Sequence, residues 1–253
     1  MQTKPFLVTV ALGAVALVLA SACSSGGEMS PPPGDDQLFV PAGLPNSSRD
    51  ATPGGLTVVA FSLVQEAAAP AIYIAVRNDG EMPACNVGMM MDLLDADGYV
   101  LTSVGGGVWS KQYYRLDPDV ILNCIDPGEI GMGASALPAD LVIADVASLS
   151  HSFPGFLLQD IVHLAGITVS GVKAVTTGAG TTYTGKLTNG FEVAVSAATA
   201  AIFPVNRVGR PLGMATNSAA PDLPPGDSLT FATSAVADPG VGYQAYAGGI
   251  PAN

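Results

Sequence analysis

Short runs of apolar and β-branched residues, broken by Gly, Pro, Asn and Asp, follow one another from residue 56 to the C-terminus. In the first half of the chain they lie at residues 56–64, 71–76, 86–94 and 99–104. Strands spaced by roughly 8 to 12 residues, with no long segment of helical period, are typical of β-sandwiches. The pattern therefore predicts an all-β protein.

Two local features sharpen this prediction. Asp97-Gly98 separates two apolar runs and predicts a tight hairpin, because Gly tolerates the positive φ that such turns need. Residues 193–203 are Ala-rich, so their intrinsic propensity favours a helix. Alternating apolar positions at the start of that segment favour a strand instead, and we predict a strand there. Residues 159–165 fit either a short helix or a connecting strand.

The second half of the chain repeats the pattern of the first. Residues 73–80, YIAVRNDG, align with residues 183–190, YTGKLTNG, and this alignment places Asp79 opposite Asn189. Two further pairs match in the same order: residues 56–64 with 167–175, and residues 126–129 with 224–227. Matches in one order along the chain predict a duplicated domain.

The expected fold is therefore two tandem Ig-like β-sandwich domains, at residues 54–158 and 159–253. The strand that closes the first domain is expected at residues 141–150. The last strands of the second are expected at residues 228–235 and 242–247. In the first domain, residues 98–128 form a longer stretch than the matching residues 209–226.

The N-terminus has the features of a targeting signal. After Lys4, residues 6–20 form an uncharged apolar run that is too short to span a bilayer but fits a signal peptide. Ala20-Ser21-Ala22 then precede Cys23, which resembles the lipobox of bacterial lipoproteins, although Ala20 stands where Leu is usual. The resemblance implies that residues 1–22 are removed and that Cys23 is lipidated. An ordinary signal peptide cut near Ala22 is the alternative.

Residues 23–53 are expected to be a lipidated Cys followed by a disordered tether. Gly, Ser and Pro dominate this stretch, and no apolar period is visible in it. An anchor and a tether would hold a folded body at a membrane surface of the bacterial cell envelope, outside the cytoplasm. In lipoproteins of bacteria with two membranes, Asp after the lipidated Cys often signals inner-membrane retention. Ser24 occupies that position here, which favours the outer membrane.

Charge and cysteine content narrow the function further. The formal net charge of −12 argues against nucleic acid as a partner. If Cys23 of the three Cys carries lipid, Cys85 and Cys124 remain, and disulfides persist outside the cytoplasm. Their spacing fits no zinc site, and a redox pair would normally show C-x-x-C. We therefore expect a structural Cys85–Cys124 disulfide.

One segment resembles a known domain family. RNDGEMPACNVGMMMDLLDADGYV, at residues 77–100, is followed by DPGE and looks like the FxLYD-type immunoglobulin-like domain of bacterial envelope proteins. The signature would fall on residues 91–95, with Met91 and Leu94 replacing its Phe and Tyr. The resemblance implies a small Ig-like sandwich outside the cytoplasm, with no catalytic residues shared across the family.

The longer stretch at residues 98–128 holds the candidate binding residues, which combine aromatic and cationic side chains: Trp109, Lys111, Tyr113, Tyr114 and Arg115. Aromatic residues beside cations are typical of surfaces that bind proteins or glycans. The alternative is a strand that packs on the sandwich. In that case Trp109, Lys111 and Tyr113 would share one face, and Ser110, Gln112 and Tyr114 the other.

Motifs for other chemistry are missing from the sequence. It contains no G-x-S-x-G and no phosphate-binding glycine motif, and the spacing of His151 and His163 fits no metal site. The Asp residues at 92, 95 and 97 fit a hairpin better than a calcium loop. Asp117 and Asp119, near Asp126, have no fixed geometry for calcium. We expect no metal and no cofactor.

These observations favour a non-enzymatic, membrane-anchored lipoprotein that acts as a binding or structural module of the cell envelope. Its expected partners are the membrane, through Cys23, and an envelope protein or glycan. An enzyme subunit, or a metal-binding envelope protein, with a site not visible from the sequence is the alternative.

Overall fold

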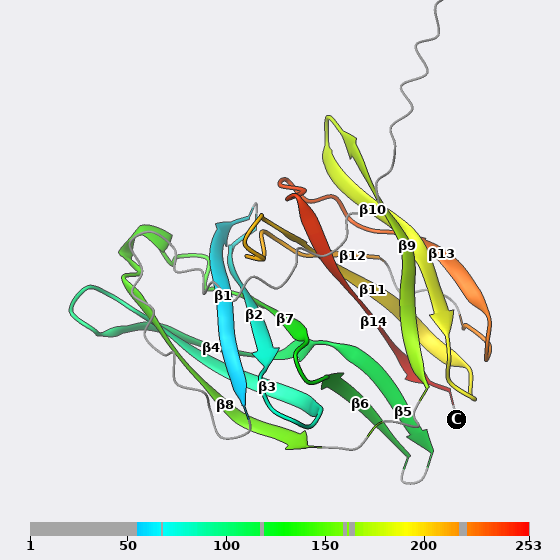
Figure 1. The fold of residues 1–253 in the computed structure, drawn as a ribbon. Helices are drawn as coiled ribbons and strands as arrows, with labels where there is room; N and C mark the ends of the chain where they lie inside the picture. The colour runs from blue at the N-terminus through cyan, green and yellow to red at the C-terminus, as the bar shows by residue number, and fades with distance from the viewer. Residues whose placement is uncertain are drawn as a thin grey trace, which may run out of the picture.

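The computed structural model describes residues 55–66, 68–116, 119–158, 161, 165–217 and 222–252. These residues form fourteen strands and one short 3₁₀ helix, η1 (Ile143–Asp145). The prediction of an all-β protein is confirmed (Figure 1). Within the described part of the chain, no helix is long and apolar enough to cross a membrane.

The strands of the first half are β1 (Leu56–Gln65), β2 (Pro70–Asn78), β3 (Ala84–Leu94), β4 (Val100–Trp109), β5 (Lys111–Leu116), β6 (Asp119–Ile125), β7 (Ile130–Ala136) and β8 (Ser148–Leu158). Those of the second half are β9 (Gly166–Thr177), β10 (Gly180–Asn189), β11 (Val195–Val205), β12 (Ala215–Thr216), β13 (Ser228–Ala232) and β14 (Gly242–Pro251).

The expected hairpin at Asp97-Gly98 joins β3 to β4. Gly98 has a φ of +84°, and the Asp95 carboxylate accepts hydrogen bonds from the backbone N–H groups of Asp97 (2.9 Å) and Tyr99 (2.8 Å). The Ala-rich segment is strand β11, as predicted. Its helix propensity is overridden because both of its faces are buried: Ile202 enters one core and Phe203 another.

The strand predicted at residues 141–150 is wrong at its start. Residues 143–145 form η1, and β8 begins only at Ser148. The backbone N–H of Leu141 donates to Pro138 O (3.0 Å) and that of Val146 to Ile143 O (3.1 Å), so tight turns occupy this stretch. The segment at residues 159–165 lies almost entirely outside the described residues.

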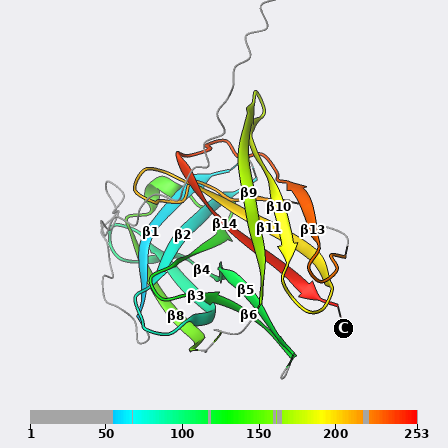
Figure 2. The same ribbon diagram turned by 45° about the vertical axis from the view of Figure 1, so that its right-hand side comes forward.

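Antiparallel pairing links most of the strands into one path, β1-β2-β7-β4-β3-β6-β5-β9-β10-β13, with β8 paired to β3. A second sheet has the order β12-β11-β14. Strand β5 joins the halves, because Gln112 pairs with Ile167 of β9. Figures 1 and 2 show β5 and β6 running from the first half toward the second.

The described residues form four hydrophobic clusters, three of them large. The first contains Phe61, Ile74 and Met91 and belongs to the first half. The second contains Tyr183, Ile202 and Phe231 of the second half. The third joins residues of both halves, with Tyr73 and Met132 of β2 and β7 against Phe203 and Tyr246 of β11 and β14.

Strand β2 separates the first core from the third core. Ile72 and Ile74 point into the first core, whereas Tyr73 and Ala75 point into the third. Both faces of β2 are therefore buried, and the two halves are packed directly against each other through apolar side chains.

The strand register corrects the alignment of the two halves by one residue. Leu56 pairs with Asn78 in the first hairpin, and Ile167 pairs with Asn189 in the second. Leu56 and Ile167 are 111 residues apart in sequence, and so are Asn78 and Asn189. Asn78, not Asp79, therefore has the same position in its hairpin as Asn189. Each hairpin also contains a register shift in its first strand. In β1 the shift follows Val58, and in β9 it lies opposite Gly185 of β10.

Candidate functional site

An open cleft of about 760 Å³ lies where the two halves meet. From the first half it is lined by residues that include Asn86, Gly107, Trp109, Gln112, Ile121 and Asn123. From the second half it is lined by Ala197, Thr199, Gly248, Gly249 and Ile250. The described residues of this lining include no Asp, Glu, Lys, Arg or His.

Gln112 connects the two walls of the cleft. Its side chain is only 7% exposed. The Nε2 atom donates to Asn123 Oδ1 on β6 (3.2 Å), and the Oε1 atom accepts from the backbone N–H of Gly249 on β14 (2.7 Å). A buried amide with partners on two strands holds one orientation, so its remaining Nε2 hydrogen has a fixed direction.

Trp109 and Gln112 both lie next to Gly248 of β14, which has no side chain. Its ring is half-buried and contacts the third core. A Cβ built on Gly248 would lie 3.3 Å from the Trp109 ring, which is tighter than ordinary packing. Gly248 therefore allows the indole ring to approach the backbone of β14 while part of the ring faces the cleft.

Both non-glycine residues with positive φ in the described chain line this cleft. Asn86 and Ala197 each have a φ of +52°. Each lies at a register shift, between Cys85 and Gly88 in β3 and between Ser196 and Thr199 in β11. They are also 111 residues apart, the separation that relates Asn78 to Asn189 in the two hairpins. Left-handed backbone at residues other than Gly is uncommon and concentrates at binding sites.

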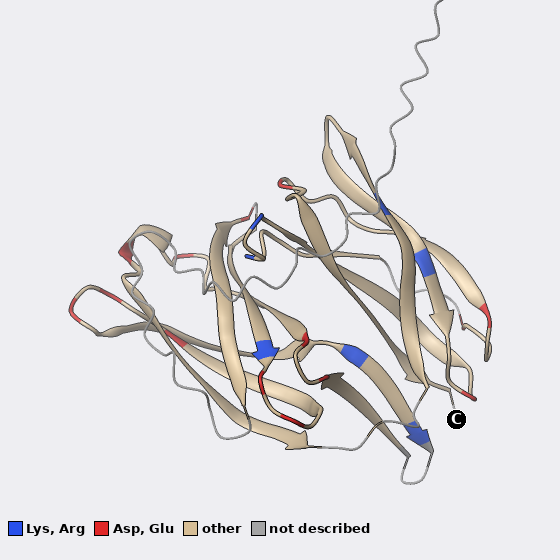
Figure 3. Cartoon of the chain, in the orientation of Figure 1, with Lys and Arg blue, Asp and Glu red and all other residues tan. Residues whose placement is uncertain are grey.

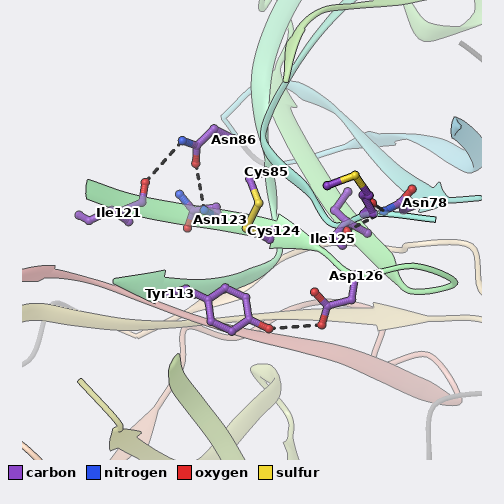
Figure 4. The surroundings of a disulfide bond; sticks show 10 residues. Asn78, Cys85, Asn86, Tyr113, Ile121, Asn123, Cys124, Ile125 and Asp126 are labelled. Carbon is purple, nitrogen blue, oxygen red and sulfur yellow. Dashed lines mark hydrogen bonds between the residues drawn. A yellow bond between two sulfur atoms is a disulfide. The ribbon is translucent and has the colours of Figure 1, made fainter. Parts of the chain in front are cut away.

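Cys85 and Cys124 form the expected disulfide beside the cleft. They face each other in the β3–β6 pairing, with Cα atoms 3.9 Å apart. Asn86 follows directly, and its Oδ1 accepts from the backbone N–H of Asn123 (2.9 Å), as Figure 4 shows. The covalent link and this hydrogen bond together hold the Asn86 and Asn123 wall in place.

Lys111 and Arg115, the two cations among the candidate binding residues, lie away from the cleft lining. Lys111 donates to Asp126 Oδ2 (3.0 Å) and Glu129 Oε1 (2.5 Å). Partial burial acts to lower the pKa of Lys111, but the hydrogen bonds to Glu129 and Asp126 outweigh it and raise the pKa above its ordinary value. The Nε atom of Arg115 is buried and has no hydrogen-bond partner among the described residues. Neither side chain is among those that line the cleft.

The two tyrosines are set apart from the cleft as well. Tyr113 donates to Asp126 Oδ2 (3.3 Å), and burial, followed by the Asp126 charge, raises the pKa of Tyr113 to about 12. Tyr114 is 7% exposed and packs against Phe191 in the second core, with ring centroids 5.6 Å apart. The structure therefore leaves the Tyr114 ring no surface for a partner and gives it a packing role.

The alternation expected along this segment is present, since Ser110, Gln112 and Tyr114 are buried while Lys111 is exposed. Of the five candidate binding residues, only Trp109 lines the cleft. Sequence reasoning missed Asn86, Asn123 and Ala197. No motif marks them, because they are adjacent only in the folded chain.

The Asp-rich hairpin has ordinary turn chemistry. Asp92 accepts from Ser103 Oγ (2.6 Å), and Asp95 caps the turn. No group of three or more His, Cys, Asp or Glu side chains that could hold a metal occurs among the described residues. Asp117 lies outside them. Charged residues are sparse along the strands, and most acidic ones lie in loops (Figure 3).

Comparison with known proteins adds little. No protein-family model matches the chain, and no curated protein matches it. Among solved structures, the crystal structure of red sea bream transglutaminase is similar, with 10% sequence identity and a TM-score of 0.23. The match covers 79% of this chain and 32% of that one. At so low a TM-score, fold and function have to be argued from the chain's own residues.

Proposed function

We propose that the protein is a non-enzymatic lipoprotein of the bacterial cell envelope, and that its folded body is a binding module whose ligand site is the Trp109 cleft. In this proposal the body consists of two Ig-like β-sandwich domains related by duplication. The shared position of Asn78 and Asn189 in the two hairpins supports the duplication. The FxLYD-type resemblance of residues 77–100 supports the Ig-like assignment and a place outside the cytoplasm.

The anchor rests on the sequence. Small residues precede Cys23, and a tether rich in Gly, Ser and Pro follows it, before the first described residue, Gly55. A chain of this composition is flexible, so it would allow the folded body to extend away from the membrane surface. Ser24 after the lipidated Cys favours the outer membrane. The anchor segment lies outside the described residues.

The site itself is carried by one observation: both left-handed non-glycine residues of the described chain line the same cleft. Strained backbone persists only where the surrounding structure holds it, and here a disulfide adjoins Asn86. The described lining offers amides, one hydroxyl, small and aliphatic side chains and one aromatic ring, and no Asp, Glu, Lys, Arg or His side chain that could transfer a proton. This chemistry supports binding rather than catalysis.

Replacement of Cys23 by Ala tests the anchor. The parent chain should enter the detergent-rich phase in phase partitioning, and Cys23→Ala should move to the aqueous phase. Ser24→Ala, which leaves the Cys in place, is the matched control and should behave like the parent. Retention of Cys23→Ala in the detergent phase would show that no lipid is attached there.

A filled cleft tests the binding role. A Cβ built on Gly107 meets no atom within 4 Å, and the backbone there is not left-handed, so Gly107→Leu can place its side chain from an open position in the lining of the cleft. Gly178, in the turn between β9 and β10, is equally open and is not part of the cleft lining, so Gly178→Leu is the control. Immobilised parent and Gly178→Leu should retain the same component of a solubilised envelope, and Gly107→Leu should not. Equal retention by all three would refute the role of the cleft.

A further inference from the structure

We infer that the ligand of the cleft is a neutral saccharide, an inference that rests on the proposed role of the cleft as the binding site. Its lining brings together one indole ring and three side-chain amides, from Trp109, Asn86, Gln112 and Asn123. A volume of about 760 Å³ is within the usual range of small-ligand sites.

The amides match sugar hydroxyl groups. A hydroxyl both donates and accepts, and a side-chain amide offers two donor hydrogens and a carbonyl oxygen. The bond from Gln112 Nε2 to Asn123 uses one of its two hydrogens, and the bond from Asn86 Nδ2 to Ile121 O (3.4 Å) uses one of its own. The second hydrogen on each nitrogen has no partner within the described part of the chain and therefore remains for a ligand.

The indole ring of Trp109 supplies the apolar part of the site. A pyranose ring presents polarised C–H groups on its flat face, and the electron-rich face of an aromatic ring attracts them. Gly248 brings β14 against the ring, and the third core supports it. The ring is thus held before a ligand arrives, which reduces the entropy lost on binding.

Charge argues against other ligand classes. The chain carries a net charge of −12, and no cation is present in the described lining to attract an anion. A cationic ligand would lack a carboxylate partner there. A purely apolar ligand would leave the amides of Gln112 and Asn123 covered and without new hydrogen bonds, which costs free energy. A neutral molecule rich in hydroxyl groups can bond to these amides, while its C–H groups pack against Trp109 and the aliphatic side chains of the lining, Val108, Ile121 and Ile250.

Intrinsic fluorescence tests this directly, because Trp109 is the only Trp in the chain. The full-length protein, in a detergent with no sugar headgroup, is titrated with cellotetraose, maltotetraose, mannotetraose and chitotetraose, and with anionic tetragalacturonate. Calorimetry is run in parallel. At least one neutral tetrasaccharide should shift the emission and give a saturable heat, and tetragalacturonate should do neither. Gly107→Leu should weaken that binding at least tenfold, and Gly178→Leu should leave it unchanged.

Two results would overturn the inference. One is that no neutral tetrasaccharide shifts the Trp109 emission or gives a saturable heat at about 10 mM, a concentration that would detect a Kd of about 1 mM. The other comes from the envelope experiment. Periodate cleaves the vicinal diols of sugars. If cleft-dependent retention survives periodate treatment of the envelope but is lost on proteolysis, the cleft binds a protein: the proposed function then holds and the saccharide assignment fails. If Gly107→Leu retains the component as the parent does, the proposed function fails.

Discussion

Asn78 and Asn189 make the same set of hydrogen bonds in the two halves of the molecule, and both are fully buried. Each side-chain amide donates to two backbone carbonyls, at Met82 and Ile125 for Asn78 and at Val193 and Leu223 for Asn189, over 2.8–2.9 Å. Each Oδ1 accepts from the backbone N–H two residues later. Each side chain thus ties the end of one strand to two other segments.

Replacement of either asparagine by Ala should destabilise the protein by about 2–4 kcal/mol, because buried carbonyl and N–H groups would lose their partners. Chemical denaturation of the full chain measures this. Asp79→Ala is the control: Asp79 is adjacent but exposed, and it pairs only with Arg77 among the interactions identified (2.6 Å). It should cost less than about 1 kcal/mol. If Asp79→Ala lowers the free energy of unfolding more than Asn78→Ala does, the matching of Asn78, in place of Asp79, with Asn189 is wrong.

The disulfide should be both present and stabilising. Mass spectrometry of non-reduced peptides should show Cys85 linked to Cys124. The double variant Cys85→Ala/Cys124→Ala should be less stable by up to about 4 kcal/mol, because a closed loop of 39 residues restricts the unfolded chain. Cys23 stays in both proteins, so the comparison isolates this bond. Free thiols at both positions in the native protein would contradict the prediction.

Tyr114 should behave as a core residue. Tyr114→Ala removes a ring packed against Phe191 and should cost about 3 kcal/mol in the free energy of unfolding. Tyr99 is 71% exposed at the β3–β4 turn, so Tyr99→Ala is the control and should change stability by less than about 0.5 kcal/mol. If the Tyr114 variant keeps full stability but loses envelope binding, the ring is a surface recognition group after all.

His151 should make stability depend on pH. It lies half-buried in β8 with its ring 5.7 Å from that of Phe153, and burial lowers its pKa from 6.5. The unfolded chain then binds a proton at a higher pH than the folded chain does. The contribution of His151 to stability is therefore present above about pH 6.5 and is lost as the pH falls below it.

Denaturation at pH 7.5 and pH 5.5 checks this expectation. The parent should lose stability between these values, and His151→Gln should lose less. A His151→Gln variant that loses as much stability as the parent would show that His151 is not the source of the pH dependence. The other histidine, His163, lies outside the described residues and is unchanged in both proteins. A parent whose stability rises on acidification over this interval would show that the folded state favours the charged imidazole.

Much of the local structure follows from the sequence. The apolar runs predict the strands, Gly98 follows Asp97 where the hairpin turns, and the count of cysteines predicts the Cys85–Cys124 bond. These features depend on neighbours in sequence, or on the chemistry of one residue type. The exception near residues 141–147 is also local: the tight turns there delay the strand to Ser148.

The candidate site could be predicted only in part. The sequence indicates Trp109, because a single Trp beside cations is conspicuous in a chain with few aromatic residues. Alternation alone does not decide whether Tyr114 or Trp109 faces solvent, because residues 109–115 place aromatic and polar side chains on both faces. The second half supplies the answer, since Phe191 covers Tyr114 and Gly248 leaves room for Trp109.

The sequence by itself therefore determined most of the strands and the turn at Asp97-Gly98, because hydrophobic period and turn chemistry act over a few residues. Only the tertiary structure decided that the halves pack through a third core, and that Asn86 and Ala197 meet at one cleft. The left-handed backbone at those positions accompanies register shifts in pairings between strands that are far apart in sequence, β3 with β8 and β11 with β14. No local pattern encodes such contacts, because their energy exists only once the chain has folded.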